Sequence, residues 1–554
     1  MSQVAPRAWL PHERPMFPGS PSTPLHPTWL RWAFGLTGVL VAITGSLGNA
    51  MVTTNLLQLQ GSLGVTAVEA AWLPAAYVMT NVSANLILIK FRQQFGLRLF
   101  TEISLVLYAL VTFGHLFVHG LGSAIAVRAA HGIVGAALTT LGIFYMIQAL
   151  PAQHRLRALA VGIGLSQIGA PIARVISPDL LEFGEWRGLY LFELGLALLS
   201  LGAVLLLRLP PGDRYKVFEM LDALSITLLS VGMALLCAVL SLGRTVWWRE
   251  APWIGWCLAS SIVLVVAGVA VEHFRANPLI NTRWLSSGLM LRLGIAIILL
   301  RMALSEQSVG AVGFLQAMGL TNEQMRGLFA VVLLGCILGI ATSAMTVRPV
   351  LTRVPALIAL GCILAGALMD AYSNNLTRPP QLMVSQFLIG FGSTFFLAPA
   401  LIAGVGSVIA QPRNLITFFV MFSITQNVGA LFGSAFLGTF QVIREKFHSS
   451  QLVEHLTLLD PLVAARVQSG AGVYGQAVTD PVLRNAQGLR QLGATASREA
   501  NVLAYNDVYF AIAAIAVMTM IWLTIVATRA RLQARRERRM AAHAATAPAA
   551  ASTP

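Results

Sequence analysis

Long apolar blocks fill this sequence between Arg31 and Arg529, and they constrain its fold more than any other feature. There are about fourteen blocks of roughly 18–28 residues each, and a helix of about 20 apolar residues crosses the ~30 Å hydrocarbon core of a bilayer. Charged residues make up only 11% of the chain, against about 25% in a typical soluble domain. The sequence therefore predicts an all-α polytopic membrane protein.

The net charge of the whole chain is +15, and the positive charge lies mainly in alternate joints between the blocks. By the positive-inside rule these joints and both termini are cytoplasmic, which requires an even number of spans, and fourteen satisfies it. Arginines spread over many joints do not form one basic face, so we expect no nucleic-acid partner. The basic joints after the second, fourth and sixth blocks contain Lys90, Arg92, Arg98, Arg155, Arg157, Arg208, Arg214 and Lys216.

Three polar regions lie outside the blocks. Residues 1–32 are rich in proline and residues 529–554 are basic, and we expect both to be disordered cytoplasmic tails. The long connection 441–506 faces outward by parity, and Leu452–Leu459 and Asp480–Leu492 within it have the composition of short helices. A passive loop and a docking site for a partner are both compatible with its sequence.

Motifs of enzymes are absent from this sequence. It contains no Walker motif, no nucleophile elbow and no metal-ligand spacing, and its four cysteines are single residues inside apolar blocks. We therefore expect no enzyme activity, cofactor or metal. Energy for any transport is expected to come from an ion gradient, since nothing in the chain binds ATP.

Three segments resemble one family, the fourteen-span drug:proton antiporters of the major facilitator superfamily (EmrB-like). Leu63–Tyr77, with Ala-Trp-Leu at 71–73, is similar to the end of their first span and the start of their second. Arg128–Ala136 resembles the arginine and glycine-rich turn of their fourth span. Glu454–Pro461 and Ala504–Val508 resemble their long outer loop and last span.

The resemblance implies two six-helix bundles that rock around a central cavity, at 33–208 and 274–528, with two additional spans at 209–273. In this family, protons flowing inward drive amphipathic toxins out across the bacterial inner membrane. Some members pass their cargo to a periplasmic adaptor protein and an outer-membrane channel. The expected partners are thus membrane lipid, a small amphipathic substrate and these two proteins.

Three features depart from the family pattern. Gly48, followed by Asn49, stands where relatives carry an acid in the first span. The joint 90–98 lacks the usual aspartate, and the glycine-rich motif of the fifth span is reduced and contains Arg174. The way in which protons would be coupled is therefore left open.

Ionisable side chains inside the spans are candidates for proton coupling or a charge relay, because each costs about 2.5–3.5 kcal/mol or more unless it is paired or hydrated. Arg128, Glu193, Arg174 and Glu306 belong to this set. Glu193 is the first choice, since a carboxyl in apolar surroundings holds its proton more tightly. A structural pair of Glu193 with Arg174 is the alternative, and Asp370 is expected only to cap a helix end.

Polar side chains within the spans are candidates to line the substrate cavity, although such groups also hold helices together. Arginines lie inside several blocks and few acids lie near the middle of a block, which favours neutral or anionic cargo. The candidates are Asn49, Thr53, Asn81, Gln167, Arg301 and Gln426.

The leading interpretation is proton-driven export of amphipathic drugs or toxic organic compounds. An uncoupled facilitator or a proton symporter on the same fold is favoured by the missing acid of the first span. A non-transporting membrane scaffold or sensor is a third class, and Arg128 with the polar first span speaks against it.

Overall fold

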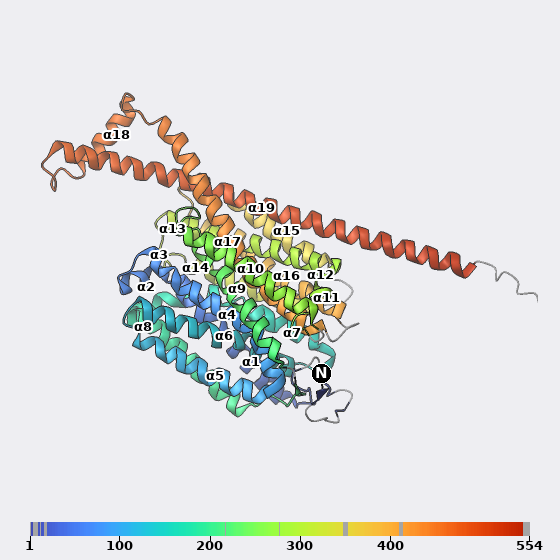
Figure 1. Ribbon diagram of the computed structural model, residues 1–554. Coiled ribbons are helices and arrows are strands. Elements are labelled where there is room, and N and C mark those ends of the chain that lie inside the picture. Colours follow the sequence, from blue (N-terminus) through green and yellow to red (C-terminus); the bar gives the residue numbers. More distant parts are fainter. Residues whose placement is uncertain are drawn as a thin grey trace, which may run out of the picture.

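The computed structural model describes residues 2–3, 9–10, 13–15, 19–216, 218–275, 278–346, 353–408 and 414–546 (Figure 1). Within these ranges, thirteen helical segments are long and apolar enough to cross a membrane. The two short strands, β1 (Ser2–Gln3) and β2 (Tyr215–Lys216), form one antiparallel pair. The expectation of an all-helical membrane protein is confirmed.

The N-terminal half is built on α1, which packs against α6 and α8, while α4 also packs against α6. Small residues permit the close crossing of α1 and α6, since a Cβ on Gly142 would lie 2.9 Å from that of Ala42. The elements are α1 (Thr28–Thr54), α2 (Leu56–Leu63), α3 (Ala67–Ala70), α4 (Trp72–Phe95), α5 (Leu97–Gly114), η1 (His115–Phe117), α6 (Leu121–Ala149), η2 (Ala152–His154), α7 (Arg155–Leu165) and α8 (Gly169–Leu206).

Helix α8 contains a break at Gly184–Glu185, where Glu185 has φ 50° and ψ −143°. The segments on either side of the break contact each other, because a Cβ on Gly188 would lie 2.1 Å from the carbonyl oxygen of Leu180. The sequence predicts two spans in this region, at 158–177 and 188–208. The break lies between these two predicted spans.

Two further helices, α9 (Met220–Leu242) and α10 (Pro252–Phe274), pack against each other. Helix α9 also contacts α4 of the N-terminal half and α17 of the C-terminal half. The pair therefore lies where the sequence predicts two additional spans, with contacts to both halves.

The C-terminal half is built on α16, which packs against α14 and α15, while α12 packs against α17. Contacts of α14 with α7 and α8, and of α17 with α4, join it to the N-terminal half. The elements are α11 (Thr282–Leu285), α12 (Gly288–Leu304), the π-helical η3 (Glu306–Ala311), α13 (Val312–Ala317), α14 (Arg326–Thr346), α15 (Arg353–Asp370), η4 (Pro379–Leu382), α16 (Met383–Val408), α17 (Leu415–Glu454), α18 (Pro461–Gly472) and α19 (Pro481–Thr546).

The long connection 441–506 is mostly helical. Helix α17 continues to Glu454, α18 packs on α19, and α19 begins at Pro481. We call residues 441–506 the outer hairpin; it projects on the opposite side of the molecule from the N-terminus and from the far end of α19 (Figure 1). Of the expected helix at Leu452–Leu459, only residues 452–454 are helical, as the end of α17, and the expected helix at Asp480–Leu492 forms the start of α19 from Pro481 onward.

Parts of the two predicted tails lie among the described residues. Ser20, Ser22 and Thr23 are buried against the N-terminal half, where Gln148 Nε2 donates to the carbonyl oxygen of Ser22 at 2.9 Å. Helix α19 runs through the basic segment to Thr546. In these described residues, contacts and helix continuation give structure that the polar composition does not reveal.

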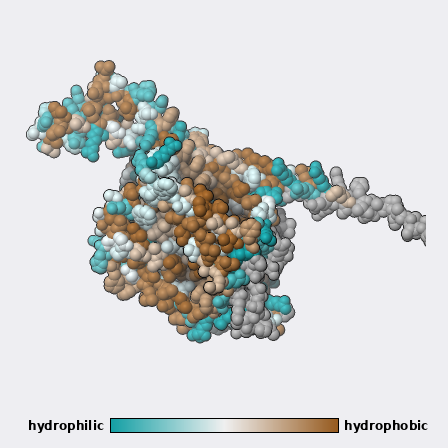
Figure 2. Space-filling view, in the orientation of Figure 1, coloured by the Kyte–Doolittle hydropathy of each residue, from teal (hydrophilic) through white to brown (hydrophobic). Residues whose placement is uncertain are grey.

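Apolar side chains cover the outside of the molecular body (Figure 2). Leu110, Leu199 and Val263 are 59%, 62% and 66% exposed, on α5, α8 and α10. Hydrophilic side chains gather on the outer hairpin and at the margins of the body (Figure 2). So large an exposed apolar surface is stable against lipid and not against water.

Candidate functional site

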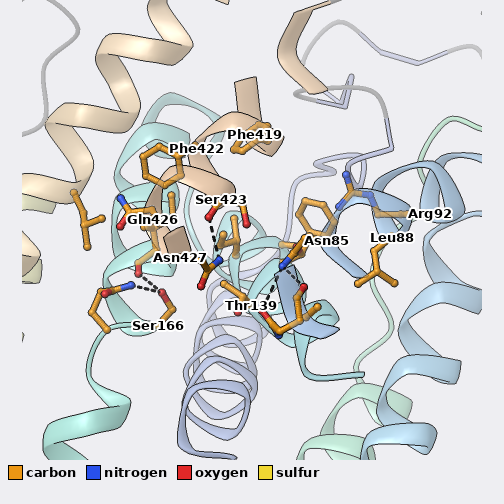
Figure 3. A pocket seen from close by; sticks show the side chains of 18 of the residues that line it. Asn85, Leu88, Arg92, Thr139, Ser166, Phe419, Phe422, Ser423, Gln426 and Asn427 are labelled. Carbon is orange, nitrogen blue, oxygen red and sulfur yellow. Dashed lines mark hydrogen bonds between the residues drawn. The ribbon is translucent and has the colours of Figure 1, made fainter. Parts of the chain in front are cut away.

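A cavity of about 230 Å³ lies between the two halves (Figure 3). Side chains of α17 face Asn85 and Arg92 of α4 across it. Arg92 is the charged member of the described lining, which is otherwise polar or apolar. The polar and aromatic lining residues are Asn81, Asn85, Thr139, Thr140, Ser166, Gln167, Ser423, Gln426, Asn427, Phe100, Phe144, Phe419 and Phe422.

Two arginines bring positive charge to this cavity. The guanidinium of Arg92 lies over the Phe144 ring, with Cζ 4.7 Å from the ring centroid. Arg301 of α12 joins the halves beside the cavity: it donates from Nη1 to Gln167 Oε1 at 3.1 Å and from Nε to the carbonyl oxygen of Gln426 at 3.2 Å. Both polar atoms of the buried Gln426 amide have no hydrogen-bond partner among the described residues. A buried amide in this state is able to bind a polar group of a ligand.

The predicted cavity residues fall into two groups. Asn81, Gln167 and Gln426 line the cavity, and Arg301 contacts two of them. Asn49 and Thr53 do not line it. The Asn49 side chain accepts from Arg128, and the Thr53 hydroxyl donates to backbone carbonyls of its own helix.

Of the cavity wall on α17, the sequence analysis selected only Gln426. Phe419, Phe422, Ser423, Gln426 and Asn427 recur at spacings of three and four residues, which place side chains on one helical face. This periodicity was available in the sequence. The mixture of aromatic and amide side chains on the face is the signal that would have identified it.

Arg128 is completely enclosed in the N-terminal half and lies outside the cavity lining. Its Nη1 donates to the carbonyl oxygen of Gly48 at 3.0 Å and its Nη2 donates to Asn49 Oδ1 at 2.7 Å. The guanidinium also lies 4.6 Å from the centroid of the Tyr77 ring and 3.2 Å from His131 Nδ1. Arg128 thus joins α1, α4 and α6.

Glu193 reaches the same cluster from α8. Its Oε1 accepts from the Tyr108 hydroxyl at 2.7 Å and lies 3.1 Å from His131 Nε2. A Cβ on Gly48 would lie 2.4 Å from this oxygen. The glycine that replaces the family's acid in the first span therefore leaves the space that the Glu193 carboxyl occupies.

Arg174 is not the partner of Glu193. Its Nη1 donates to Asn322 Oδ1 at 2.7 Å, and the Asn322 amide donates to the carbonyl oxygen of Thr54 at 2.7 Å and to Asn55 Oδ1 at 3.2 Å. We call this group the outer latch. It joins the connection before α14 to α1 and α8, on the face opposite the N-terminus.

An exposed ion pair reinforces the outer latch. Both terminal nitrogens of Arg326 donate to the carboxylate of Asp179 at 2.8 Å. The latch and this pair hold the two halves in contact on that face. The cavity residues Leu88 and Arg92 lie instead toward the end of α4 beside the N-terminal tail, where a Cβ on Gly19 would approach Arg92 Nε to 3.3 Å.

Glu306 is buried in the C-terminal half, away from the other candidates. Its Oε1 accepts from Gln386 Nε2 at 2.8 Å, and the same nitrogen donates to Asp370 Oδ2 at 2.7 Å. Asp370 is only 1% exposed. The expectation that Asp370 merely caps a helix at the membrane surface is thus wrong, because its carboxyl binds a side chain of the neighbouring helix α16.

At the opposite face, an acid of another helix forms the ion pairs that an aspartate in the joint 90–98 would be expected to form. Asp222 of α9 supplies the carboxylate, 2.6 Å from Lys90 Nζ, and it also accepts from Arg275 at 2.8 Å. Burial opposes the charge of Arg275, but its hydrogen bonds to Asp222, Glu219 and Glu272 outweigh this and raise its pKa. The two additional helices therefore contribute the acids of this network.

Comparison with known structures supports the architecture. The crystal structure of the human organic anion transporter MFSD10 (TETRAN) matches with a TM-score of 0.53 at 12% identity, covering 90% of this chain and 100% of that chain. At this identity the likeness shows the fold alone. No curated protein matches the sequence.

A family-level match is more decisive. The sequence model of the Major Facilitator Superfamily matches residues 38–434, which is more than half of the chain. This superfamily consists of transporters, in agreement with the many apolar helices and the cavity between two halves. The protein is a multi-pass membrane transporter that belongs to the major facilitator superfamily.

Proposed function

We propose that this transporter exports amphipathic organic compounds, anionic or neutral, across a bacterial inner membrane in exchange for protons. The observation that carries the cargo class is the central cavity, in which Gln426 has an unpartnered amide, Arg301 binds the Gln426 backbone and Arg92 lies on the facing wall. No carboxylate occurs among the described lining residues. Such a cavity favours an anion over a cation, since a cation would be desolvated beside positive charge.

Aromatic side chains define the second part of the cargo. Phe100, Phe144, Phe419 and Phe422 line the cavity and offer flat apolar surface. Pockets for small molecules combine such surface with a few polar groups that fix orientation. An aromatic sulfonate or carboxylate matches both features. The organic anion transporter with the same fold is consistent with this class.

The finer architecture is also a proposal. We expect fourteen spans, with α7 and the first part of α8 forming one and the rest of α8 another, separated at Gly184–Glu185. The ends of the described chain lie on one side (Figure 1), and the basic joints on that side favour the cytoplasm. An even number of spans and a long outer hairpin agree with EmrB-like antiporters.

Binding measurements test the cargo class. A naphthalene sulfonate should bind the purified protein more tightly than the matched neutral sulfonamide, and Arg301→Gln should weaken sulfonate binding by about tenfold or more while changing sulfonamide binding little. Arg98→Gln is the matched control, because Arg98 is exposed and pairs with Glu102 on its own helix. Equal loss for both ligands, or an unchanged sulfonate affinity, would contradict the proposal.

A facilitator or symporter on the same fold remains the second candidate. It is favoured by Gly48, which places no acid on the first span. The direction of cargo movement in an imposed proton gradient separates these modes. A scaffold without transport is disfavoured because it has no need of a cavity with unpartnered polar groups.

A further inference from the structure

We propose that Glu306 and Asp370 form one proton-binding site, in which Gln386 joins the two carboxyls and the pair gains and loses a proton during transport. This inference rests on the proposed proton coupling and assigns its location. The site lies in the C-terminal half, between η3, the end of α15, the start of α16 and α19.

Burial is the first argument. Glu306 and Tyr509 are 0% exposed, and Asp370 and Gln386 are 1% exposed. One nitrogen of Gln386 donates to both carboxyls, at 2.8 and 2.7 Å. The two acids are therefore close neighbours in a dry environment. Two negative charges in such a place repel each other strongly and lose their hydration, so the pair retains a proton under conditions where exposed acids are ionised.

Missing counter-charge is the second argument. In the described part of the chain, no basic side chain forms an ion pair with either carboxyl. Arg301, which precedes Glu306 on the same segment, donates to Gln167 and to the backbone of α17. Arg444 of α17 is paired with Asp507 of α19 at 2.6 Å.

Helix α19 brings two phenols to the surroundings of the site. Tyr505 and Tyr509 of α19 face this region, with the Tyr505 hydroxyl near Gly313 and the Tyr509 ring near Gly310. Neither brings positive charge. A proton is thus the means by which the site reduces its negative charge.

Unused hydrogen-bonding capacity is the third argument. Glu306 Oε2 and the Tyr509 hydroxyl are buried and have no partner among the described residues. Both side chains flank Gly310, where a Cβ would lie 3.1 Å from Glu306 Oε1 and 3.0 Å from Tyr509 Cε1. An ionised Glu306 would leave Oε2 as a buried charged oxygen without a donor, whereas a protonated Glu306 carries an O–H of its own. This unused capacity supports proton binding at Glu306.

The chain also connects this site to the cavity. Arg301 lies on α12 beside the cavity, and Glu306 begins the π-helical segment that follows it. π-Helical turns inside helices are frequent at functional sites. Protonation of Glu306 weakens its repulsion by Asp370, so this short segment is placed to transmit the change to Arg301.

Among the described residues, the Glu193 carboxyl, unlike those of Glu306 and Asp370, lies close to basic side chains. Glu193 accepts a hydrogen bond from Tyr108 and lies beside His131, which Arg128 contacts. Donors and positive charge stabilise an ionised carboxylate. We therefore assign Glu193 to holding α1, α5, α6 and α8 together, and the exchange of protons to Glu306 and Asp370.

Infrared titration of the purified full-length protein tests the site without any cargo. The wild type should show a buried carboxylic-acid C=O band that disappears on deprotonation. The band should be lost in Glu306→Gln, and it should be shifted in Glu306→Asp and in Asp370→Asn. The control Glu102→Gln, at a half-buried residue paired with Arg98, should leave it unchanged. An identical band in all variants would overturn the assignment, as would a band lost in Glu193→Gln alone or removed by sodium at constant pH.

Reconstituted transport gives the second test. Exchange of labelled for unlabelled cargo at equilibrium needs the cavity but no net proton movement. Glu306→Gln should retain this exchange within about twofold and lose accumulation driven by a pH gradient by at least about tenfold. Retained gradient-driven accumulation would overturn the proposal. Failure of the wild type to move any cargo would instead contradict the proposed function, while the infrared result would still report on the proton site.

Discussion

Asn322 holds the two halves together on the face opposite the N-terminus, so Asn322→Ala should release that face. The side chain is buried and belongs to the connection between α13 and α14. It accepts from Arg174 at 2.7 Å and donates to the backbone of Thr54 and to the Asn55 side chain. Alanine removes all three interactions without adding volume.

The magnitude follows from these contacts. Hydrogen bonds between membrane helices contribute about 0.6 kcal/mol each on average, and those to charged groups contribute about 1.5–3 kcal/mol. Loss of one bond to Arg174 and two to α1 and the residue after it should therefore destabilise the closed arrangement by about 3–4 kcal/mol, a shift of about 100- to 1,000-fold in its population relative to the open one.

Distances between spin labels measure this shift. Labels at Glu182→Cys and Glu323→Cys, both exposed and on opposite sides of the outer latch, should give one short distance in the wild type. Asn322→Ala should add a longer distance. The control Asn375→Ala removes a hydrogen bond to Glu499 within the C-terminal half and should change nothing. Superimposable distributions for Asn322→Ala and the wild type would refute the reasoning.

Three further predictions concern helix packing, the ion pairs of Asp222 and the outer hairpin. Gly132→Ala should destabilise the protein by about 1–3 kcal/mol in thermal unfolding, because its Cβ would lie 2.2 Å from a backbone oxygen of α4. The control Gly122→Ala meets no atom within 4 Å and should leave the stability unchanged. Asp222→Asn loses contacts to two basic side chains and should cost roughly 3 kcal/mol of stability. Glu102→Gln, at a much less buried ion pair, should cost less than about 1 kcal/mol. Equal effects would contradict the network. Deleting 455–480 should abolish capture of a periplasmic adaptor protein while retaining cargo binding, and equal capture would remove the docking role.

The positions of polar residues along single helices were predictable from helical periodicity. Asn81, Gln167 and Gln426 line the cavity because polar side chains inside apolar spans have few other stable locations. Arg128 is enclosed in the N-terminal half, as its position inside a span suggested. These inferences use only neighbours along one helix, and a sequence contains that information.

Contacts between distant segments were not predictable in the same way. Gln386 is 80 residues from Glu306 in the chain, and nothing local marks it as the group that joins the two acids. The fit of the Glu193 carboxyl against Gly48 likewise requires α8 to lie beside α1. The outer hairpin was expected to be a polar connection with short helices, yet it is formed largely by α17 and α19 continuing out of the membrane-spanning region.

The central claim is exchange of organic anions for protons, and flux in proteoliposomes tests it most directly. An aromatic sulfonate stays ionised and does not cross lipid as a neutral acid, and the membrane potential can be held at zero with potassium and valinomycin. Vesicles with an acidic lumen should then accumulate the sulfonate above its external concentration as protons leave. Accumulation only in vesicles with an alkaline lumen would show symport. Uptake that does not depend on the pH gradient would show a facilitator. Either result would contradict exchange of organic anions for protons.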